Sequence, residues 1–225
     1  MKTLLATWVT GLIVLLAALP TARAETPQAD ADARFDAGVA ALSEHRYDDA
    51  AAAFREVAAQ FPFRAPVLYN LGVSYLGAER RDEAFAAFQI LRTLYPENPA
   101  VHLNLARIYR EMGHARQERD ALIAAIRLKP DYTTAHRRLA HSFLREGSYY
   151  AATAEYGWLI EHADHAGIPP QPSELYYLAI LEERLGEKKA ARSLYQRLLA
   201  MDPQGEHADD ARKTLDRLTS EMVEP

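Results

Sequence analysis

The sequence has 225 residues, a formal net charge of -5 at neutral pH and no cysteine. The absence of cysteine excludes a disulfide framework and thiolate chemistry, and it removes the cysteine that carries the lipid of bacterial lipoproteins. The mild acidity argues against a nucleic-acid partner, because general nucleic-acid binding needs a basic surface.

Residues 1–24 have the pattern of a secretory signal peptide. Lys2 precedes an apolar run from Leu4 to Leu19, and Ala22-Arg23-Ala24 is the small-x-small pattern that signal peptidase recognises. An uncleaved membrane anchor is the alternative, but this run of 16 residues is short for a bilayer core. We therefore expect cleavage after Ala24, a periplasmic or secreted protein, and no stable membrane insertion after cleavage.

After the leader, residues 25–32 are polar and acidic, so we expect a disordered lead-in. A repeat period then becomes visible, because Pro62, Pro96, Pro130 and Asp164 are each 34 residues apart. This register divides the chain into four units, which span residues 31–64, 65–98, 99–132 and 133–166.

The unit at 65–98 predicts two short amphipathic helices. Apolar residues recur at helical spacing on one face of each helix: Leu68, Leu71, Tyr75 and Leu76 on the first, and Ala84, Phe88, Leu91 and Tyr95 on the second. Two helices with one apolar face each must pack together. Gly72 and Ala84 leave space for the backbones to approach, and Pro96 ends the second helix.

This unit resembles the tetratricopeptide repeat (TPR), whose 34-residue pattern is W-x2-L-G-x2-Y, then A-x3-F, then P. The matching residues are Leu71, Gly72, Tyr75, Ala84, Phe88 and Pro96, with Leu68 at the Trp position. The resemblance implies an all-α fold, a right-handed α-solenoid of about five TPR helix pairs with a C-terminal capping helix. It also implies a protein-interaction scaffold whose concave groove holds a peptide or partner protein.

The third and fourth repeats depart from the pattern in two places. Glu118 stands where the pattern has a small alanine, so its carboxylate must point outward or pair with a neighbour such as Arg116 or Arg119, and looser helix packing is expected there. The fourth repeat ends at Asp164 in place of proline, and an insertion of five residues follows. Its stiff loop, from Gly167 to Pro172, is either a tolerated surface insertion or a binding loop.

The C-terminal part completes the predicted array from residue 31 to residue 205. A fifth repeat spans residues 172–205, and residues 206–225 form a capping helix and tail. The capping helix has one apolar face, made by Ala208, Ala211, Leu215, Leu218 and Met222. A solenoid needs such a cap, because its last repeat has no neighbour on one side.

Enzyme motifs are absent from the sequence: we find no nucleophile elbow, Walker loop, dinucleotide fingerprint, HExxH or paired-cysteine pattern. We therefore expect a protein that is not an enzyme, with no catalytic residues and no cofactor. Glu161, His162, Asp164 and His165 have ligand-like spacing, but a metal would require all of them to converge on one ion. We favour a solvated surface and no metal site.

The predicted groove changes character along the array. Repeats one and two place apolar residues there: Phe35, Val39, Leu42, Tyr69, Val73 and Leu76. Repeats three and four place basic and polar residues there: Asn104, Arg107, Arg110, Arg137, Arg138, His141 and Arg145. Repeat five adds Tyr176 and Ile180. A cleft lined by one sign of charge attracts ligands of the opposite sign, so we predict a partner segment with an apolar anchor followed by acidic residues or a free carboxylate. The alternative is that these arginines pair with Glu111, Glu146 and Glu183.

The resemblance adds a detail to this prediction. In chaperone-binding TPR proteins, Asn and basic residues clamp a peptide's terminal carboxylate, and Asn104 and Arg138 fit part of that pattern. Tyr69 and Thr134 stand where the clamp has lysines. Asn at this position is also common in repeats without a clamp, so a structural role for Asn104 is favoured over a clamp.

Two functions fit these features. The first is an exported scaffold that binds a peptide or partner protein during envelope assembly or secretion. The second is a structural spacer, or an oligomerising accessory subunit, of a larger envelope complex.

Overall fold

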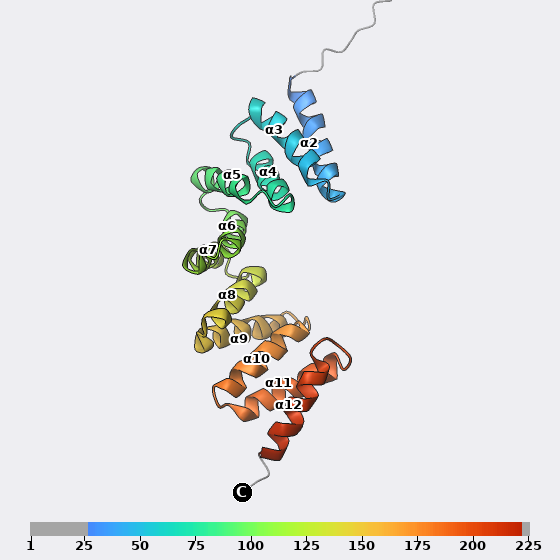
Figure 1. Cartoon of the computed structure of the whole chain (residues 1–225), viewed down its shortest axis with the longest axis vertical. Helices are drawn as coiled ribbons and strands as arrows, with labels where there is room; N and C mark the ends of the chain where they lie inside the picture. Colours follow the sequence, from blue (N-terminus) through green and yellow to red (C-terminus); the bar gives the residue numbers. More distant parts are fainter. Residues whose placement is uncertain (1–26, 222–225) are drawn as a thin grey trace, which may run out of the picture.

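The computed structural model describes residues 27–221, which form eleven helices and no strand (Figure 1). The helices follow one another as five pairs and a final single helix: α2 (Pro27–Ser43) with α3 (Tyr47–Gln60), α4 (Ala65–Gly77) with α5 (Arg81–Leu94), α6 (Pro99–Glu111) with α7 (Ala115–Leu128), α8 (Thr133–Glu146) with α9 (Tyr149–His165), α10 (Pro172–Arg184) with α11 (Lys188–Met201), and α12 (Ala208–Glu221). The pairs stack along one long axis in Figure 1. The predicted all-α solenoid is confirmed.

Small residues at the helix crossings allow each pair to close. A Cβ atom added to Gly72 would lie 2.8 Å from the ring of Phe88, and one added to Gly38 would lie 2.8 Å from the ring of Phe54. Both rings are fully buried, as is Ala84. The aromatic ring of the second helix therefore lies directly on the backbone of the first, as the repeat pattern predicts.

A left-handed residue ends the first helix of every pair. Gly113, Gly147 and Gly186 adopt it with φ of 76°, 78° and 90°, and His45 and Glu79 adopt it with φ of 58° and 59°. These five residues stand at the same position of their repeats, fifteen residues into each unit. Glycine takes this conformation without steric cost, whereas a residue with a Cβ atom does not.

The prediction that residues 25–32 form a disordered lead-in is wrong for residues 27–32, because these residues belong to α2. Pro27 is the first residue of α2, a position that suits proline because its missing N–H would have no helical partner there. Ala31 is fully buried, and Asp32 accepts a hydrogen bond from Arg64 at 2.9 Å. These contacts hold the first helix against the second repeat. Residues 25 and 26 and the predicted leader lie outside the described part of the chain.

The buried apolar side chains form three clusters along the axis. The N-terminal cluster joins α2 to α6, and the C-terminal cluster joins α8 to α12. The middle cluster, between repeats three and four, is the smallest, with seven buried residues: Leu103, Ala106, Ala121, Leu122, Ala125, Ala135 and Leu139. The interior is thus rich in apolar contacts at both ends and poorer in the middle.

Glu118 lies beside this middle cluster and is only 3% exposed. Its carboxylate accepts a hydrogen bond from Nη2 of Arg145, one repeat further on, at 2.6 Å. The expected partners were wrong, because Arg119 pairs instead with Glu146. The departure from the repeat pattern is therefore compensated by a long-range ion pair.

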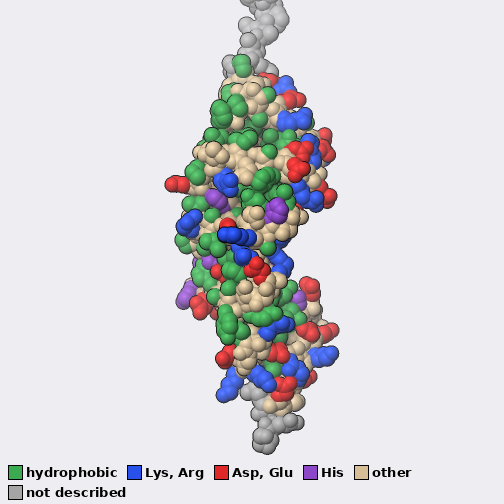
Figure 2. Space-filling view, turned by 60° about the vertical axis from the view of Figure 1, so that its left-hand side comes forward, with side chains coloured by type: hydrophobic (Ala, Val, Ile, Leu, Met, Phe, Trp, Pro, Cys, Tyr) green, Lys and Arg blue, Asp and Glu red, His purple; other side chains and the backbone are tan. Residues whose placement is uncertain are grey.

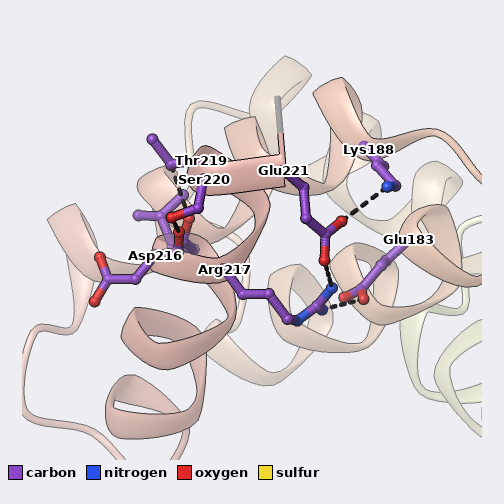
Figure 3. Close-up of polar contacts among 8 residues, drawn as sticks. Glu183, Lys188, Asp216, Arg217, Thr219, Ser220 and Glu221 are labelled. Atoms are coloured by element: carbon purple, nitrogen blue, oxygen red, sulfur yellow. Dashed lines mark hydrogen bonds and ion pairs between the residues drawn. The ribbon is translucent and has the colours of Figure 1, made fainter. Parts of the chain in front are cut away.

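The last helix, α12, covers the end of the array by packing on α11, with Ala208, Ala211 and Leu218 buried. Ion pairs also connect α12 to the fifth repeat. Arg217 pairs with both Glu183 and Glu221, and Lys188 Nζ lies 2.8 Å from Glu221 (Figure 3). The capping helix therefore has the apolar inner face that the sequence indicates, whereas Met222 lies outside the described residues. Within residues 27–221, no helix combines the length and apolarity needed to cross a bilayer.

Candidate functional site

Side chains from the first helix of successive pairs meet along one face of the array, which we call the groove face. Asn104 on α6 donates a hydrogen bond to Tyr69 on α4, and Arg138 on α8 donates one to the Leu103 carbonyl on α6. The ring of His141 on α8 contacts that of Tyr177 on α10. These contacts link side chains of successive first helices along this face. Its local chemistry differs from the prediction in three respects.

The apolar end of the groove face is more enclosed than predicted. Leu76 is 4% exposed and belongs to the N-terminal core, so its placement on a binding surface is wrong. Phe35 and Tyr69 are half-buried and contact core rings edge-on, with centroid distances of 5.4 Å to Phe54 and 5.8 Å to Phe88. Val73 also packs partly against the core. Much of this apolar surface therefore serves helix packing.

Asn104 has a structural role in this conformation. Its amide nitrogen donates to the hydroxyl of Tyr69 at 3.1 Å and to the carbonyl of Ala100 at 2.9 Å. The side chain thereby links α4 to α6. A ligand carboxylate that bonded this amide would have to displace one of the two contacts.

Three of the predicted groove arginines already have carboxylate partners. Arg137 lies 2.8 Å from Glu174, Arg145 lies 2.6 Å from Glu118, and Arg107 lies 3.0 Å from Glu111. Glu174 and Glu118 are each 3% exposed, so the arginines neutralise carboxylates that would otherwise be buried without a partner. Of the three glutamates that the sequence suggested as partners, only Glu111 pairs with a groove arginine.

Arg110 and Arg138 differ from the others, and we call them the arginine pair. Neither forms an ion pair with any residue between 27 and 221. Arg138 has only a long hydrogen bond, 3.4 Å, from its Nη1 to the Leu103 carbonyl. Partial burial is the main cause that lowers the pKa of Arg138, and the positive charges of Arg110 and Arg107 lower it further. Figure 2 shows basic side chains gathered near mid-height of the face in view. The arginine pair therefore carries the uncompensated positive charge of the groove face.

His141 lies beside the arginine pair. Its Nδ1 is 2.9 Å from the hydroxyl of Tyr156, to which it is hydrogen-bonded. Burial lowers the pKa of His141, and the nearby charges of Arg145, Arg137 and Arg110 lower it further. The imidazole is therefore neutral at physiological pH, and the positive charge here belongs to the arginines.

A group of aromatic rings continues the groove face toward the cap. Tyr176 stacks on His207 with centroids 4.1 Å apart and an interplanar angle of 3°, and its hydroxyl donates to Asp210. Tyr177 contacts both rings. The prediction included Tyr176 but missed Tyr177 and His207. The signal for Tyr177 was present, because it occupies the repeat position of Asn104 and Arg138 once the insertion is counted.

The cluster with ligand-like spacing does not converge. Asp164 pairs with Arg197, and His162 stacks on Trp158 with centroids 4.7 Å apart. Within residues 27–221, no group of His, Asp and Glu side chains is arranged to hold a metal ion. The inserted loop instead covers a small cavity beside these residues, lined in part by Leu159, Pro169 and the Arg137–Glu174 pair.

A family model described as Tetratricopeptide repeat matches residues 16–65, 35–99, 69–131 and 137–206. Among solved structures, the MamA protein is 18% identical with a TM-score of 0.67, over 78% of this chain and 93% of that chain. YrrB, described as a TPR protein with an unusual peptide-binding site, is 17% identical with a TM-score of 0.67, over 84% and 95%. The Pseudomonas aeruginosa protein pilF is 21% identical with a TM-score of 0.70, over 84% of each chain.

These likenesses to solved structures show the fold. A comparison with curated protein sequences finds no match.

Proposed function

This chain belongs to the tetratricopeptide repeat family, and from that premise we propose that it is a scaffold whose groove face binds an acidic segment of a partner protein. The segment supplies a carboxylate, from Asp, Glu or a chain terminus, to Arg110 and Arg138. YrrB, which has a similar fold, is described as having a peptide-binding site. That description supports a peptide or protein as the ligand class.

The observation that carries this proposal is the lack of carboxylate partners for the arginine pair. On the same face, Arg107, Arg137 and Arg145 each have a partner within 3.0 Å. Arg138 is in contrast partly buried, and the positive charges of Arg110 and Arg107 lower its pKa by more than the negative charge of Glu118 raises it. A bound carboxylate would relieve this repulsion and accept charge-assisted hydrogen bonds from the two guanidinium groups. The site therefore favours an anionic group over a neutral or basic one.

Two variants of equal charge change test the proposal. In the first, Arg110→Glu is combined with Arg138→Gln, which removes the positive charge from the groove face. In the control, Arg92→Glu is combined with Arg127→Gln, at exposed positions on the second helices α5 and α7. Both variants are to be compared with the wild type by circular dichroism, so that binding is compared among folded proteins.

Binding is measured with a photo-crosslinking amino acid placed at Ile180 of the groove face, followed by mass spectrometry of the captured protein. We expect crosslinks that weaken with added salt, persist in the control and disappear in the Arg110/Arg138 variant. Equal crosslinking by both folded variants would contradict the proposal. It would favour the alternative of a spacer or oligomerising subunit that uses other surfaces.

We also propose that the protein is exported and acts in the bacterial envelope, in assembly or secretion. The support is the leader pattern that ends at Ala22-Arg23-Ala24. The expected mature protein begins at Glu25 and is found in the periplasmic fraction. Intact-mass measurement after fractionation checks this, and a full-length mass in the membrane pellet would contradict it.

A further inference from the structure

We propose that Tyr177, Tyr176 and His207 form a second subsite of the groove face, which takes an aromatic side chain of the bound segment. The partner would then present an acidic residue to the arginine pair and an aromatic ring to these three residues. The inference rests on the proposed function, since it describes the same ligand in more detail. The sequence predicts an apolar anchor in repeats one and two, whereas the structure favours an aromatic anchor at the other end.

Tyr177 is the centre of this aromatic subsite. Its ring contacts four others, with centroid distances of 5.2 Å to His141, 5.6 Å to Tyr176, 5.8 Å to Tyr156 and 5.9 Å to His207. These rings come from α8, α9, α10 and the loop before α12. Such edge-to-face and stacked arrangements are those in which aromatic rings attract one another, so a ligand ring can extend the same packing.

Exposure distinguishes the subsite from the core. Tyr156 and Tyr195 are buried to 1% exposure or less, whereas Tyr176, Tyr177 and His207 are all partly exposed. The hydroxyl of Tyr177 has no hydrogen-bond partner in the described part of the chain, although a buried tyrosine hydroxyl usually has one. This end of Tyr177 is therefore available to solvent or to a ligand.

The capping segment holds the far side of the subsite in place. His207 lies flat on Tyr176, and Asp210 accepts the hydrogen bond of the Tyr176 hydroxyl. Two separate contacts thus fix the orientation of the Tyr176 ring before any ligand binds. A preorganised surface loses less side-chain entropy on binding, which favours a specific site over an adaptable patch.

His141 connects the aromatic subsite to the arginine pair. Its ring meets Tyr177 nearly at a right angle, 84°, and it lies three residues after Arg138 on α8, a spacing that places both side chains on the same side of the helix. The two subsites therefore adjoin, and one short segment can reach both. Charge complementarity selects its acidic residue and ring packing selects its aromatic residue.

A selection experiment with a phage-displayed library of random dodecapeptides tests this inference. The library is panned separately against the wild type, against Tyr177→Ala, and against Tyr150→Ala as a control at a tyrosine that is 79% exposed on α9. We expect the wild type and the control to enrich peptides that contain both acidic and aromatic residues. Tyr177→Ala should keep the acidic preference and lose the aromatic one.

The best peptide is then synthesised with its aromatic residue intact and with that residue replaced by alanine, and Kd is measured by fluorescence anisotropy. The replacement should weaken binding to the wild type on the order of tenfold and should have little effect on binding to Tyr177→Ala. Tyr177→Phe should bind like the wild type. Tyr177→Leu keeps apolar volume without a ring and gives the same test if Tyr177→Ala does not fold.

The outcomes separate the two proposals. If the wild type enriches no acidic peptide, the proposed function is wrong and this inference falls with it. If acidic peptides are enriched without an aromatic preference, or if that preference persists in Tyr177→Ala and Tyr177→Leu, only the aromatic subsite is overturned.

Discussion

Gly72 shows how one residue position decides whether a helix pair can close. A methyl group at Gly72 would lie 2.8 Å from the Phe88 ring, which is fully buried, so the ring or the backbone would have to shift. Gly72→Ala should therefore destabilise the protein by roughly 1–3 kcal/mol, the usual cost of overpacking a core. Urea unfolding monitored by circular dichroism measures this change.

Gly157 provides the matched control for this substitution. It lies inside α9, and a Cβ atom there would meet no other atom within 4 Å. Gly157→Ala should raise stability by up to about 1 kcal/mol, because alanine is the better helix former. If the two substitutions changed stability by the same amount and in the same direction, close approach at Gly72 would not be the explanation.

His141 should make stability depend on pH in a defined direction. Its pKa lies below the ordinary value of 6.5 in the folded protein, so the unfolded chain binds the proton first as the pH falls. Stability should thus decrease as the pH falls through about 6.5. His141→Gln cannot titrate, so its Tm should fall less than that of the wild type between about pH 7.5 and about pH 5.5. Equal losses of Tm would argue against a neutral His141 in the folded state.

The two helices of each pair depend on the turn that joins them, and the second repeat has an unfavourable residue in that turn. Glu79 has a φ of 59° where three other repeats have glycine. Glu79→Gly should stabilise the protein by about 1 kcal/mol. The left-handed conformation costs a residue with a Cβ atom roughly 1–2 kcal/mol, and glycine avoids this cost. Part of the gain is lost because glycine gives up more backbone entropy on folding.

Gly113 offers the reverse substitution in the next repeat. An added Cβ atom would touch nothing within 4 Å, so its φ of 76° is the only obstacle. Gly113→Ala should therefore lower the free energy of unfolding by about 1 kcal/mol. Thermal unfolding of Glu79→Gly and Gly113→Ala measures both changes in stability. Stabilisation by both substitutions would contradict the explanation from the backbone conformation.

At the scale of elements, the repeat period predicted most of the fold, because it follows from residues that each unit needs for itself. The small residue at Gly72, the aromatic ring at Phe88 and the closing Pro96 fix the two helices and their crossing within one unit. The start of α2 was missed, since its support comes from Arg64 in the following repeat. The local composition around Asp32 does not indicate its hydrogen bond with Arg64.

The candidate site was predictable only in part, for the same reason. The repeat register identified the face on which Arg107, Arg110 and Arg137 lie. It did not reveal which of them already had partners, because Glu174 lies 37 residues from Arg137, across the inserted loop. The burial of Leu76 likewise depends on neighbouring helices. Pairing between units thus decides which groove residues remain available to a ligand.

At the scale of the whole molecule, long-range ion pairs join successive units throughout the array. Arg64 with Asp32, Arg197 with Asp164 and Arg217 with Glu183 each connect residues about one repeat apart. These side chains are all partly exposed to solvent, so each pair contributes little to stability by itself. Their common spacing indicates that they align neighbouring repeats, while the apolar clusters supply most of the stability.

The division of the interior into three clusters has a mechanical consequence. The junction between repeats three and four is held by the small middle cluster, which shares only Tyr109 with the N-terminal cluster and Phe143 with the C-terminal cluster. Arg110 on α6 and Arg138 on α8 lie on opposite sides of this junction. A segment held by both arginines would act as a brace across it, so that capturing a partner would also stiffen the protein at this junction.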